Sequence, residues 1–275
     1  MRDHKELTSI AANVRRNIIE MLHESGSGHP GGSLSAVEIV TALYFDEMNI
    51  DPENPKKENR DRFVLSKGHA APVIYSVLAE RKYFDKAELM KLRKTGAMLQ
   101  GHPDMKGTPG IEMSTGSLGQ GFSAACGMAM ASKLDGSPWR VYALLGDGEV
   151  QEGLVWEAAM SAAHYKLDNL VAFLDNNGLQ IDGKNEEVLG VDPLAEKFKA
   201  FGWNVLEIDG HDFDHIFTAL DAAKSAAGRP TMIVAKTVKG KGVSFMENQA
   251  GWHGKAPNAQ EREIALRDLG GRFDE

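Results

Sequence analysis

Two short apolar runs of the sequence each end in residues that can bind a metal ion. The run Val141–Leu145 is followed by Gly146–Gly148 (GDG), and the run Leu170–Leu174 is followed by Asp175–Asn177 (DNN). Carboxylate and amide oxygens are hard donors that suit Mg²⁺ or Ca²⁺. Because Mg²⁺ usually completes its octahedral shell with water and phosphate oxygens, the pattern predicts a metal-held diphosphate.

Each apolar run is expected to be a strand whose carboxyl end carries these polar residues. In the second half of the chain, short apolar runs alternate with segments of helical period, which predicts an α/β fold with a mostly parallel sheet and helices on both faces. Ligands of such sheets bind beyond the carboxyl ends of the strands. We expect residues 1–275 to form a single domain. The segment Arg62–Ala71 (RFVLSKGHAA) is expected to be a short strand followed by a turn, and the other expected strands are Val141–Leu145, Leu170–Leu174, Asn204–Ile208 and Thr231–Ala235. The expected helices are Leu7–Glu24, Leu34–Phe45, Pro72–Arg81, Lys86–Thr95, Leu118–Leu134, Val155–Tyr165, Pro193–Phe201 and Phe213–Ala227.

Composition limits the classes of function open to the chain. Its 275 residues are 42% hydrophobic, and its formal net charge is −8 without a basic block, which argues against a nucleic-acid partner. No apolar run approaches the roughly 20 residues of a membrane span, and the charged N-terminus lacks the apolar core of a signal peptide. Cys126, the one cysteine, lies among small apolar residues and is expected to be buried. We therefore expect a cytoplasmic protein without disulfides or membrane contacts.

Simpler interpretations of the motifs also exist. Asp-Gly and Asn-Gly are common turn pairs, so either polar cluster alone fits an ordinary turn or hairpin. The segment Gly26–Gly31 (GSGHPG) matches the dinucleotide-binding pattern G-x-G-x-x-G, but it follows a helical pattern and contains Pro30, so it fails the required strand–turn–helix context. The segment Asp175–Gly183 lacks the acid spacing and terminal Glu of a calcium-binding EF-hand loop.

Taken together, the two clusters resemble the thiamine diphosphate-binding motif, in which GDG (here Gly146–Gly148) is followed, after one helix and one strand, by NN (here Asn176 and Asn177). Other segments resemble, in the same order along the chain, the blocks of the transketolase family, from about Asn13 to Pro257. The resemblance implies the thiamine diphosphate-binding fold and an enzyme of the transketolase class. The segments are SGHPGGSLS, LSKGHAAPVIY, GHPD, TGSLGQGFSAACGMA, GDGEVQEGLVWEA, LDNNGLQIDG and WHGKAP.

The same resemblance implies a metal site and a cofactor site. The metal, expected to be Mg²⁺ with Ca²⁺ or Mn²⁺ as alternatives, would be held by Asp147, Asn177 and the carbonyl of Leu179. The residues implied at thiamine diphosphate are Gly148 and Asn177 at the diphosphate, Gly116, Ser117 and Leu118 beside the aminopyrimidine, Ile181 near the thiazolium ring, Glu152, and the histidines His69 and His253.

Four histidines fall on family positions in glycine-flanked loops. An imidazole can donate to oxygen and exchange a proton near neutral pH, which suits contacts with a diphosphate and with sugar hydroxyls. By the resemblance, His69 and His253 lie toward the diphosphate. The residues implied to face the donor sugar, as catalytic residues, are His29, His102 and His253. The remaining histidines match no family position and are expected to be structural: His4, His23, His164, His211 and His215.

The resemblance also implies a partner chain. Thiamine chemistry needs a glutamate at the pyrimidine N1′, which in transketolases lies in a pyrimidine-binding domain that follows the part matched here. We therefore expect the N-terminal, diphosphate-binding half of a split transketolase, inactive alone. Its partner would be a C-terminal subunit with the pyrimidine-binding and C-terminal domains, in an assembly of two of each chain. Glu152 and Glu157 match acidic positions that link paired active sites across the subunit interface of the family.

The expected reaction transfers a two-carbon ketol unit from a ketose phosphate, with xylulose 5-phosphate as the donor, to an aldose phosphate. A split transketolase for other ketoses is an alternative, because the residues that read the sugar phosphate lie in the partner. The alpha subunit of a 2-oxoacid dehydrogenase also carries GDG and NN, but the SGHPGGSLS, SKGHA and WHG segments favour transketolase. A non-catalytic relative would have lost metal or histidine positions, and all of them match. The chain departs from the family at Ser117, where many members have proline, and at Gly178, where some have lysine.

Overall fold

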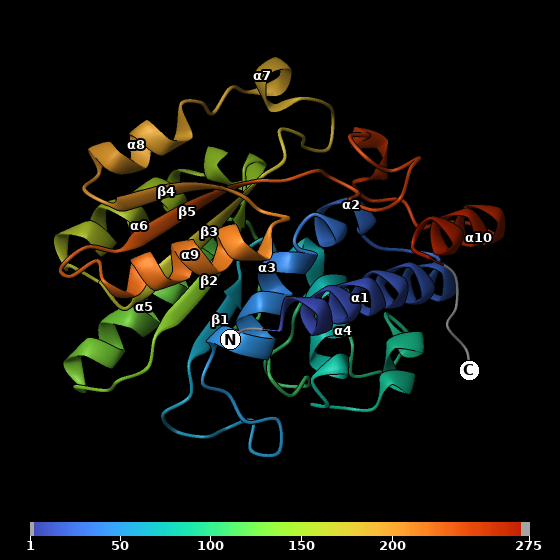
Figure 1. Ribbon diagram of the computed structural model, residues 1–275, viewed down its shortest axis with the longest axis horizontal. Helices are drawn as coiled ribbons and strands as arrows, with labels where there is room; N and C mark the ends of the chain where they lie inside the picture. The colour runs from blue at the N-terminus through green and yellow to red at the C-terminus, as the bar shows by residue number, and fades with distance from the viewer. Residues whose placement is uncertain (1–2, 271–275) are drawn as a thin grey trace.

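The computed structural model describes residues 3–270, and its centre is a five-stranded sheet. Every neighbouring pair of strands is parallel, in the order β1-β2-β3-β5-β4 (Figure 1). The predicted α/β fold with a parallel sheet is therefore confirmed. The strands are β1 (Arg62–Leu65), β2 (Val141–Gly146), β3 (Leu170–Asn176), β4 (Asn204–Asp209) and β5 (Thr231–Lys236).

Helices cover both faces of the sheet (Figure 1). Successive side chains of a strand point to opposite faces, so each central strand supplies two separate cores. Tyr142 and Phe173 belong to one core, whereas Ala143 and Leu174 belong to the other. Cys126 lies in the second core and is buried, as predicted. The helices of the first core include α1 (His4–Ser25), α3 (Val37–Ala42), α4 (Ala71–Glu80) and α9 (Phe213–Lys224), and those of the second are α5 (Gln120–Leu134), α6 (Gly153–His164) and α8 (Leu194–Ala200).

The ends of α1 show why the glycine-rich segment after it forms a loop. At the start of the helix, the Asp3 side chain accepts hydrogen bonds from the backbone N–H groups of Lys5 and Glu6 (3.1 and 3.0 Å), which otherwise have no helical partner. At the end, Gly26 adopts the left-handed conformation with φ +63°, which glycine accepts without steric cost. The chain leaves the helix there and runs directly into the loop that carries His29.

Two predicted helices differ from the structure. The predicted helix Leu34–Phe45 is divided into α2 (Pro30–Leu34), α3 and a π-helical turn, η1 (Leu43–Glu47). The prediction of a helix over Lys86–Thr95 was wrong, because this segment contains only a 3₁₀ turn, η3 (Lys86–Lys91). The chain reverses after η3 at Arg93, whose φ is +62° and whose N–H donates to the carbonyl of Leu99 (2.9 Å).

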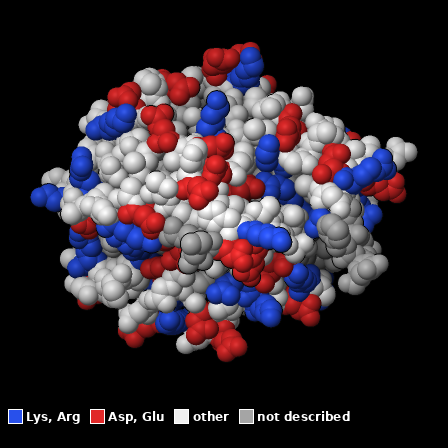
Figure 2. All heavy atoms as spheres, viewed as in Figure 1, with Lys and Arg blue, Asp and Glu red and all other residues white. Residues whose placement is uncertain are grey.

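The remaining short elements lie mostly at the carboxyl edge of the sheet or near the C-terminus. They are η2 (Gly68–Ala70), η4 (Gly148–Gln151), α7 (Asn185–Val188), η5 (Ala250–Trp252) and α10 (Ala259–Asp268). No helix within residues 3–270 is both long enough and apolar enough to cross a membrane. On the face seen in Figure 2, basic and acidic side chains are interspersed.

Candidate active site

The two polar clusters of the sequence meet at the carboxyl edge of the sheet. Gly146 of β2 pairs with Asp175 of β3, so the residues that follow the two strands are neighbours. The carboxylate of Asp147 accepts hydrogen bonds from the N–H of Gly148 (2.8 Å) and from the N–H of Gly178 (2.5 Å). The Asp147 side chain thus joins the turn after β2 to the loop after β3, and the predicted meeting of these clusters is confirmed.

The three predicted metal donors line one pocket of about 370 Å³. The Asn177 amide group donates to Asp175 (3.4 Å), while its oxygen accepts the N–H of Leu179 (3.1 Å). The carbonyl of Leu179 accepts a hydrogen bond from the ammonium group of Lys239 (3.1 Å). Asp147, Asn177 and Leu179 therefore bring a carboxylate, an amide oxygen and a carbonyl to one pocket, and these hard donors fit Mg²⁺ with its remaining positions filled by water and phosphate.

The donor set is poor in charged ligands. Residues 3–270 contain no group of three His, Cys, Asp or Glu side chains that could hold a metal ion by themselves. Burial, and then the nearby negative charge of Asp175, raise the pKa of Asp147 to about 6. A cation beside Asp147 would favour its ionised form. This arrangement suits a metal that is bound together with an anionic ligand.

The loop after Asn177 is a tight reversal as well as a source of a metal donor. Leu179 and Lys184 form an isolated antiparallel bridge, and the N–H of Gln180 donates to the carbonyl of Gly183 (2.9 Å). Gly178 has φ +77°, a conformation that favours glycine over other residues. The hairpin interpretation of this segment and the metal interpretation are thus compatible, because the turn is what presents the Leu179 carbonyl to the pocket.

Four histidines from separate segments form one cluster; His29, His69 and His253 line the pocket, whereas His102 is exposed and lies beside it. The His29 ring lies 5.4 Å from that of His69, 6.4 Å from that of His102 and 5.3 Å from that of His253, measured between centroids. The His69 and His253 rings are 5.0 Å apart. The structure therefore brings together all four histidines that the sequence motifs single out.

The electrostatics of the pocket keep these rings neutral. Burial, and then the charge of Arg93, lower the pKa of His29 to about 4. Burial, and then the charge of Lys239, lower the pKa of His253 to about 3. Burial also lowers the pKa of His69 and of His102. At neutral pH each ring can therefore donate from one nitrogen and accept at the other.

Two ring nitrogens show what the cluster can still bind. His29 Nδ1 is buried and has no hydrogen-bond partner within the described part of the chain, so it is available to a ligand. His253 Nδ1 lies 3.1 Å from the ammonium group of Lys239, which makes this nitrogen an acceptor and leaves Nε2 as the donor. The cluster thus has both a free buried nitrogen and an oriented N–H donor for an oxygen-rich ligand.

The other predicted cofactor residues are spread around the same pocket. Gly116 approaches His102 so closely that a Cβ atom there would lie 3.2 Å from the ring. Ser117 is exposed and does not line the pocket, and Glu157, from α6, does not line it either. Ile181 lines it while 66% of its surface is exposed. The predicted residues that line the pocket are His29, His69, Gly116, Leu118, Asp147, Gly148, Glu152, Asn177, Leu179, Ile181 and His253.

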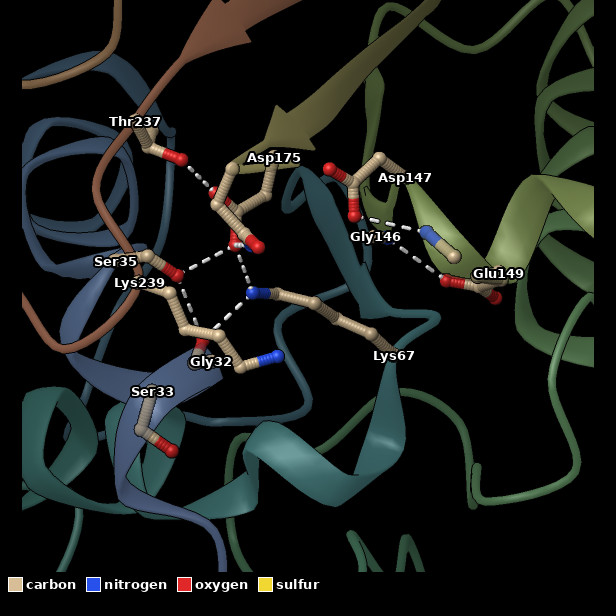
Figure 3. A network of polar contacts seen from close by, with 12 residues as sticks. Gly32, Ser33, Ser35, Lys67, Gly146, Asp147, Glu149, Asp175, Thr237 and Lys239 are labelled. Carbon is tan, nitrogen blue, oxygen red and sulfur yellow. Dashed lines mark hydrogen bonds and ion pairs between the residues drawn. The ribbon is translucent and has the colours of Figure 1, made fainter. Parts of the chain in front are cut away.

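A buried ion pair beneath the pocket was not predicted from the sequence. Figure 3 shows Lys67, Ser35 and Thr237 pointing toward the Asp175 carboxylate, which accepts a hydrogen bond from each. Lys67 also donates to the carbonyl of Gly32 (2.6 Å). Burial alone would raise the pKa of Asp175, but the charge of Lys67 and these hydrogen bonds lower it. This ion pair joins the end of β3 to the loops that precede α3 and α4.

Glu149 was also not predicted, and it joins three other segments of the site. Its carboxylate, 2% exposed, accepts hydrogen bonds from Ser66 Oγ (2.5 Å), from the N–H of Gly119 (2.9 Å) and from the N–H of Gly146 (3.1 Å). These bonds connect the end of β1, the loop after Gly116 and the end of β2. The Glu in GDGE was a visible signal, since a charged residue directly after a buried strand needs partners.

Comparisons with known proteins agree with this geometry. A family model described as "Transketolase, thiamine diphosphate binding domain" matches residues 7–274. The chain is 49% identical over 259 residues to the 6-deoxy-6-sulfo-D-fructose transketolase subunit SqwG of Clostridium sp. (strain MSTE9), covering 94% of each chain. It is 42% identical to one of the subunits of apulose-4-phosphate transketolase from Phocaeicola vulgatus, covering 94% of this chain and 92% of that one.

Longer relatives match over part of their length. Human transketolase is 45% identical over 250 residues, which are 90% of this chain and 40% of the human one. The crystal structure of Campylobacter jejuni transketolase superposes with a TM-score of 0.93 and 33% identity, covering 100% of this chain and 44% of that one. The chain spans nearly the whole of its subunit relatives and less than half of the long transketolases. It therefore belongs to the transketolase family of transferases, as the N-terminal part that binds thiamine diphosphate.

Proposed function

We propose that this chain is the diphosphate-binding subunit of a two-chain transketolase. With a C-terminal partner subunit, thiamine diphosphate and Mg²⁺, it transfers a two-carbon ketol unit from a ketose phosphate to an aldose phosphate. The observation that carries the proposal is one pocket in which the oxygen donors Asp147, Asn177 and Leu179 meet three neutral histidines, His29, His69 and His253, with the His102 ring 6.4 Å from that of His29. The subunit names of the relatives support a partner chain.

The cofactor would be held mainly through its diphosphate. Asp147, Asn177 and the carbonyl of Leu179 would bind the metal, and the metal would bind phosphate oxygens. Lys239 adds a buried ammonium group to the same pocket, and we assign His69 and Gly148, which also line it, to the diphosphate. When bound, thiamine diphosphate supplies the carbon nucleophile that carries the ketol unit.

The histidines would handle the hydroxyl groups of the sugar. Because His29, His102 and His253 are neutral at pH 7, each can accept a proton from a hydroxyl group or donate one to it. His253 is oriented for donation from Nε2, since Lys239 occupies its Nδ1. The free Nδ1 of His29 supplies an acceptor or a donor according to tautomer. Together these neutral rings can hold a polyol and exchange protons with its hydroxyl groups.

The remaining components are assigned to the partner chain. It would supply the glutamate for the pyrimidine N1′ and the residues that bind the sugar phosphate. We propose an assembly of two of each chain, in the cytoplasm, with residues 1–275 as one cofactor-binding domain. Glu152, at the pocket, and Glu157, on the exposed side of α6, would face the subunit interface.

The donor sugar is proposed by class. Xylulose 5-phosphate is the donor expected of a transketolase, but two similar subunits are named for 6-deoxy-6-sulfofructose and apulose 4-phosphate. All three are ketoses with an anionic group, and this chain contributes contacts to the cofactor and the hydroxyl groups. We therefore propose an anionic ketose as the donor, with its identity set by the partner chain.

The proposal is tested by reconstitution. The purified chain is mixed with its candidate partner, thiamine diphosphate and Mg²⁺, and ketol transfer is measured from each of the three donors to an aldose phosphate. We expect transfer only when both chains are present. Transfer by this chain alone would contradict the need for a partner. A stable complex that binds the cofactor yet transfers no ketol unit from any of these donors would contradict the proposed reaction.

A further inference from the structure

His211 lies outside the pocket, in the turn between β4 and α9, and has two hydrogen bonds that fix its ring. Its Nε2 atom accepts a hydrogen bond from the backbone N–H of Val238 (2.9 Å). Because a nitrogen that accepts carries no proton, the proton of the neutral ring is on Nδ1. Nδ1 lies 2.9 Å from the carboxylate of Glu38 and therefore donates to it. The backbone partner thus determines the tautomer of His211.

The acid that receives this proton is itself held by an arginine. Glu38, on α3, is buried and forms two contacts with the guanidinium group of Arg15 on α1 (2.7 and 2.8 Å). Burial alone would raise the pKa of Glu38, but the charge of Arg15 and the hydrogen bonds from His211 and Arg15 lower it to about 2. Arg15 Nε also donates to the carbonyl of Lys241 (3.1 Å). The three side chains therefore contact the loop after β5 at Val238 and at Lys241.

Lys239 lies between these two contact points. Its side chain leaves the loop, and its ammonium group reaches the carbonyl of Leu179 (3.1 Å) and His253 Nδ1 (3.1 Å). The residue is only 2% exposed, so the loop must be held in place for the ammonium group to keep these partners. The N–H of Gly240 donates to the carbonyl of Gly31 (3.0 Å), which adds a third attachment of the same loop.

We propose that His211 is a positioning residue of the cofactor site. Held by Glu38 and Arg15, it fixes the backbone of Val238 and so places the ammonium group of Lys239 beside the Leu179 carbonyl and His253. The inference rests on the proposed function, because it assigns His211 a part in holding the diphosphate. The ring acts through the backbone and touches neither the cofactor nor the substrate.

Two substitutions of His211 each retain one of the two hydrogen bonds of the ring and remove the other. Glutamine at position 211 reaches as far as Nε2, so His211→Gln retains an acceptor for the N–H of Val238. Asparagine ends near Nδ1, so His211→Asn retains a donor for Glu38 and loses the acceptor. His215→Gln is the matched control, because His215 is an exposed histidine lining the same surface groove of about 1000 Å³.

Two readouts are measured on the full chain. The first is hydrogen exchange of the Val238 amide without ligand, followed by NMR. The second is the dissociation constant of thiamine diphosphate in the presence of Mg²⁺, measured by calorimetry. We expect His211→Asn to speed exchange and to weaken binding about tenfold, the effect of losing about one hydrogen bond. His211→Gln and His215→Gln should bind as the unmodified chain does.

The outcomes separate this inference from the proposed function. The inference would be overturned if His211→Asn bound thiamine diphosphate as tightly as the unmodified chain. It would also be overturned if the Val238 amide of that variant exchanged no faster than it does in the unmodified chain. Equal losses in His211→Gln and His211→Asn would also overturn it, because only the second lacks the acceptor. If the unmodified chain does not bind thiamine diphosphate with Mg²⁺, the proposed function fails, while the exchange of Val238 still shows whether His211 fixes the loop.

Discussion

Asp175→Asn should strongly destabilise the protein, because it leaves the Lys67 ammonium buried without its counter-charge. The side chains of the pair are 2% and 0% exposed, so water cannot replace the lost carboxylate. Removing one partner of such a pair costs about 3–5 kcal/mol. Ser35 and Thr237 would also donate to a neutral amide in place of a carboxylate. We expect the free energy of unfolding to fall by about 4 kcal/mol.

The assay is urea unfolding at pH 7, followed by circular dichroism. The control is Glu196→Gln, which removes the exposed pair between Glu196 and Lys199 and should change stability by less than about 1 kcal/mol. The double variant Lys67→Met with Asp175→Asn should be more stable than Asp175→Asn alone, because it removes the uncompensated charge. A loss in Asp175→Asn no larger than that of the control would refute the idea that this ion pair holds the pocket together.

Three further predictions concern the metal donor, the histidines and a glycine. Asp147→Ala should abolish Mg²⁺-dependent binding of thiamine diphosphate in calorimetry while leaving the circular dichroism spectrum unchanged; undiminished affinity would overturn the metal assignment. The pKa of His29 is about 4 in the folded chain, against a reference value of 6.5. As the pH drops, the unfolded chain therefore takes up the proton first, and this ring makes the free energy of unfolding fall between about pH 6.5 and pH 4. His29→Asn should therefore lose less stability than the unmodified chain in urea unfolding at pH 5 against pH 7, and an identical loss would argue against a buried neutral ring. Gly240→Ala should lower the free energy of unfolding by at least about 2 kcal/mol, because the new Cβ would lie 2.4 Å from a backbone carbonyl oxygen. Gly228→Ala, at a similar φ of +72° with open space around it, should lower it by only about 1 kcal/mol. Equal losses of stability in thermal unfolding would show that the loop around Gly240 shifts to accept the Cβ.

The parallel sheet was predictable because its signal is local. The central strands β2, β3 and β5 are short apolar runs whose length and flanking polar residues are visible in the sequence, and such runs are typical of parallel strands buried on both faces. The helix predicted over Lys86–Thr95 failed for a tertiary reason. Its residues have helical spacing, but the left-handed turn at Arg93 and its hydrogen bond to Leu99 reverse the chain.

The site was predictable in part. Asp147, Asn177 and the four histidines stand in recognisable motifs, so the sequence singles them out, and all of them except His102 line the pocket. Lys67, Lys239 and Glu149 were missed because their partners lie far away along the chain. Lys67 is 108 residues from Asp175, and the pairing exists only after β1 and β3 have entered the same sheet. No local pattern distinguishes such a lysine from an exposed one.

The histidine cluster determines when, during synthesis, the chain becomes able to bind a ligand in this pocket. Its rings come from loops near both ends of the described chain, since His29 precedes α2 and His253 follows η5. During synthesis, a chain that ends before His253 lacks one wall of the pocket even if its sheet is complete. A ligand of this pocket binds the finished fold and not a fragment of it, so it stabilises only the native state. Cofactor binding would therefore report that the chain has been made and folded at least as far as His253.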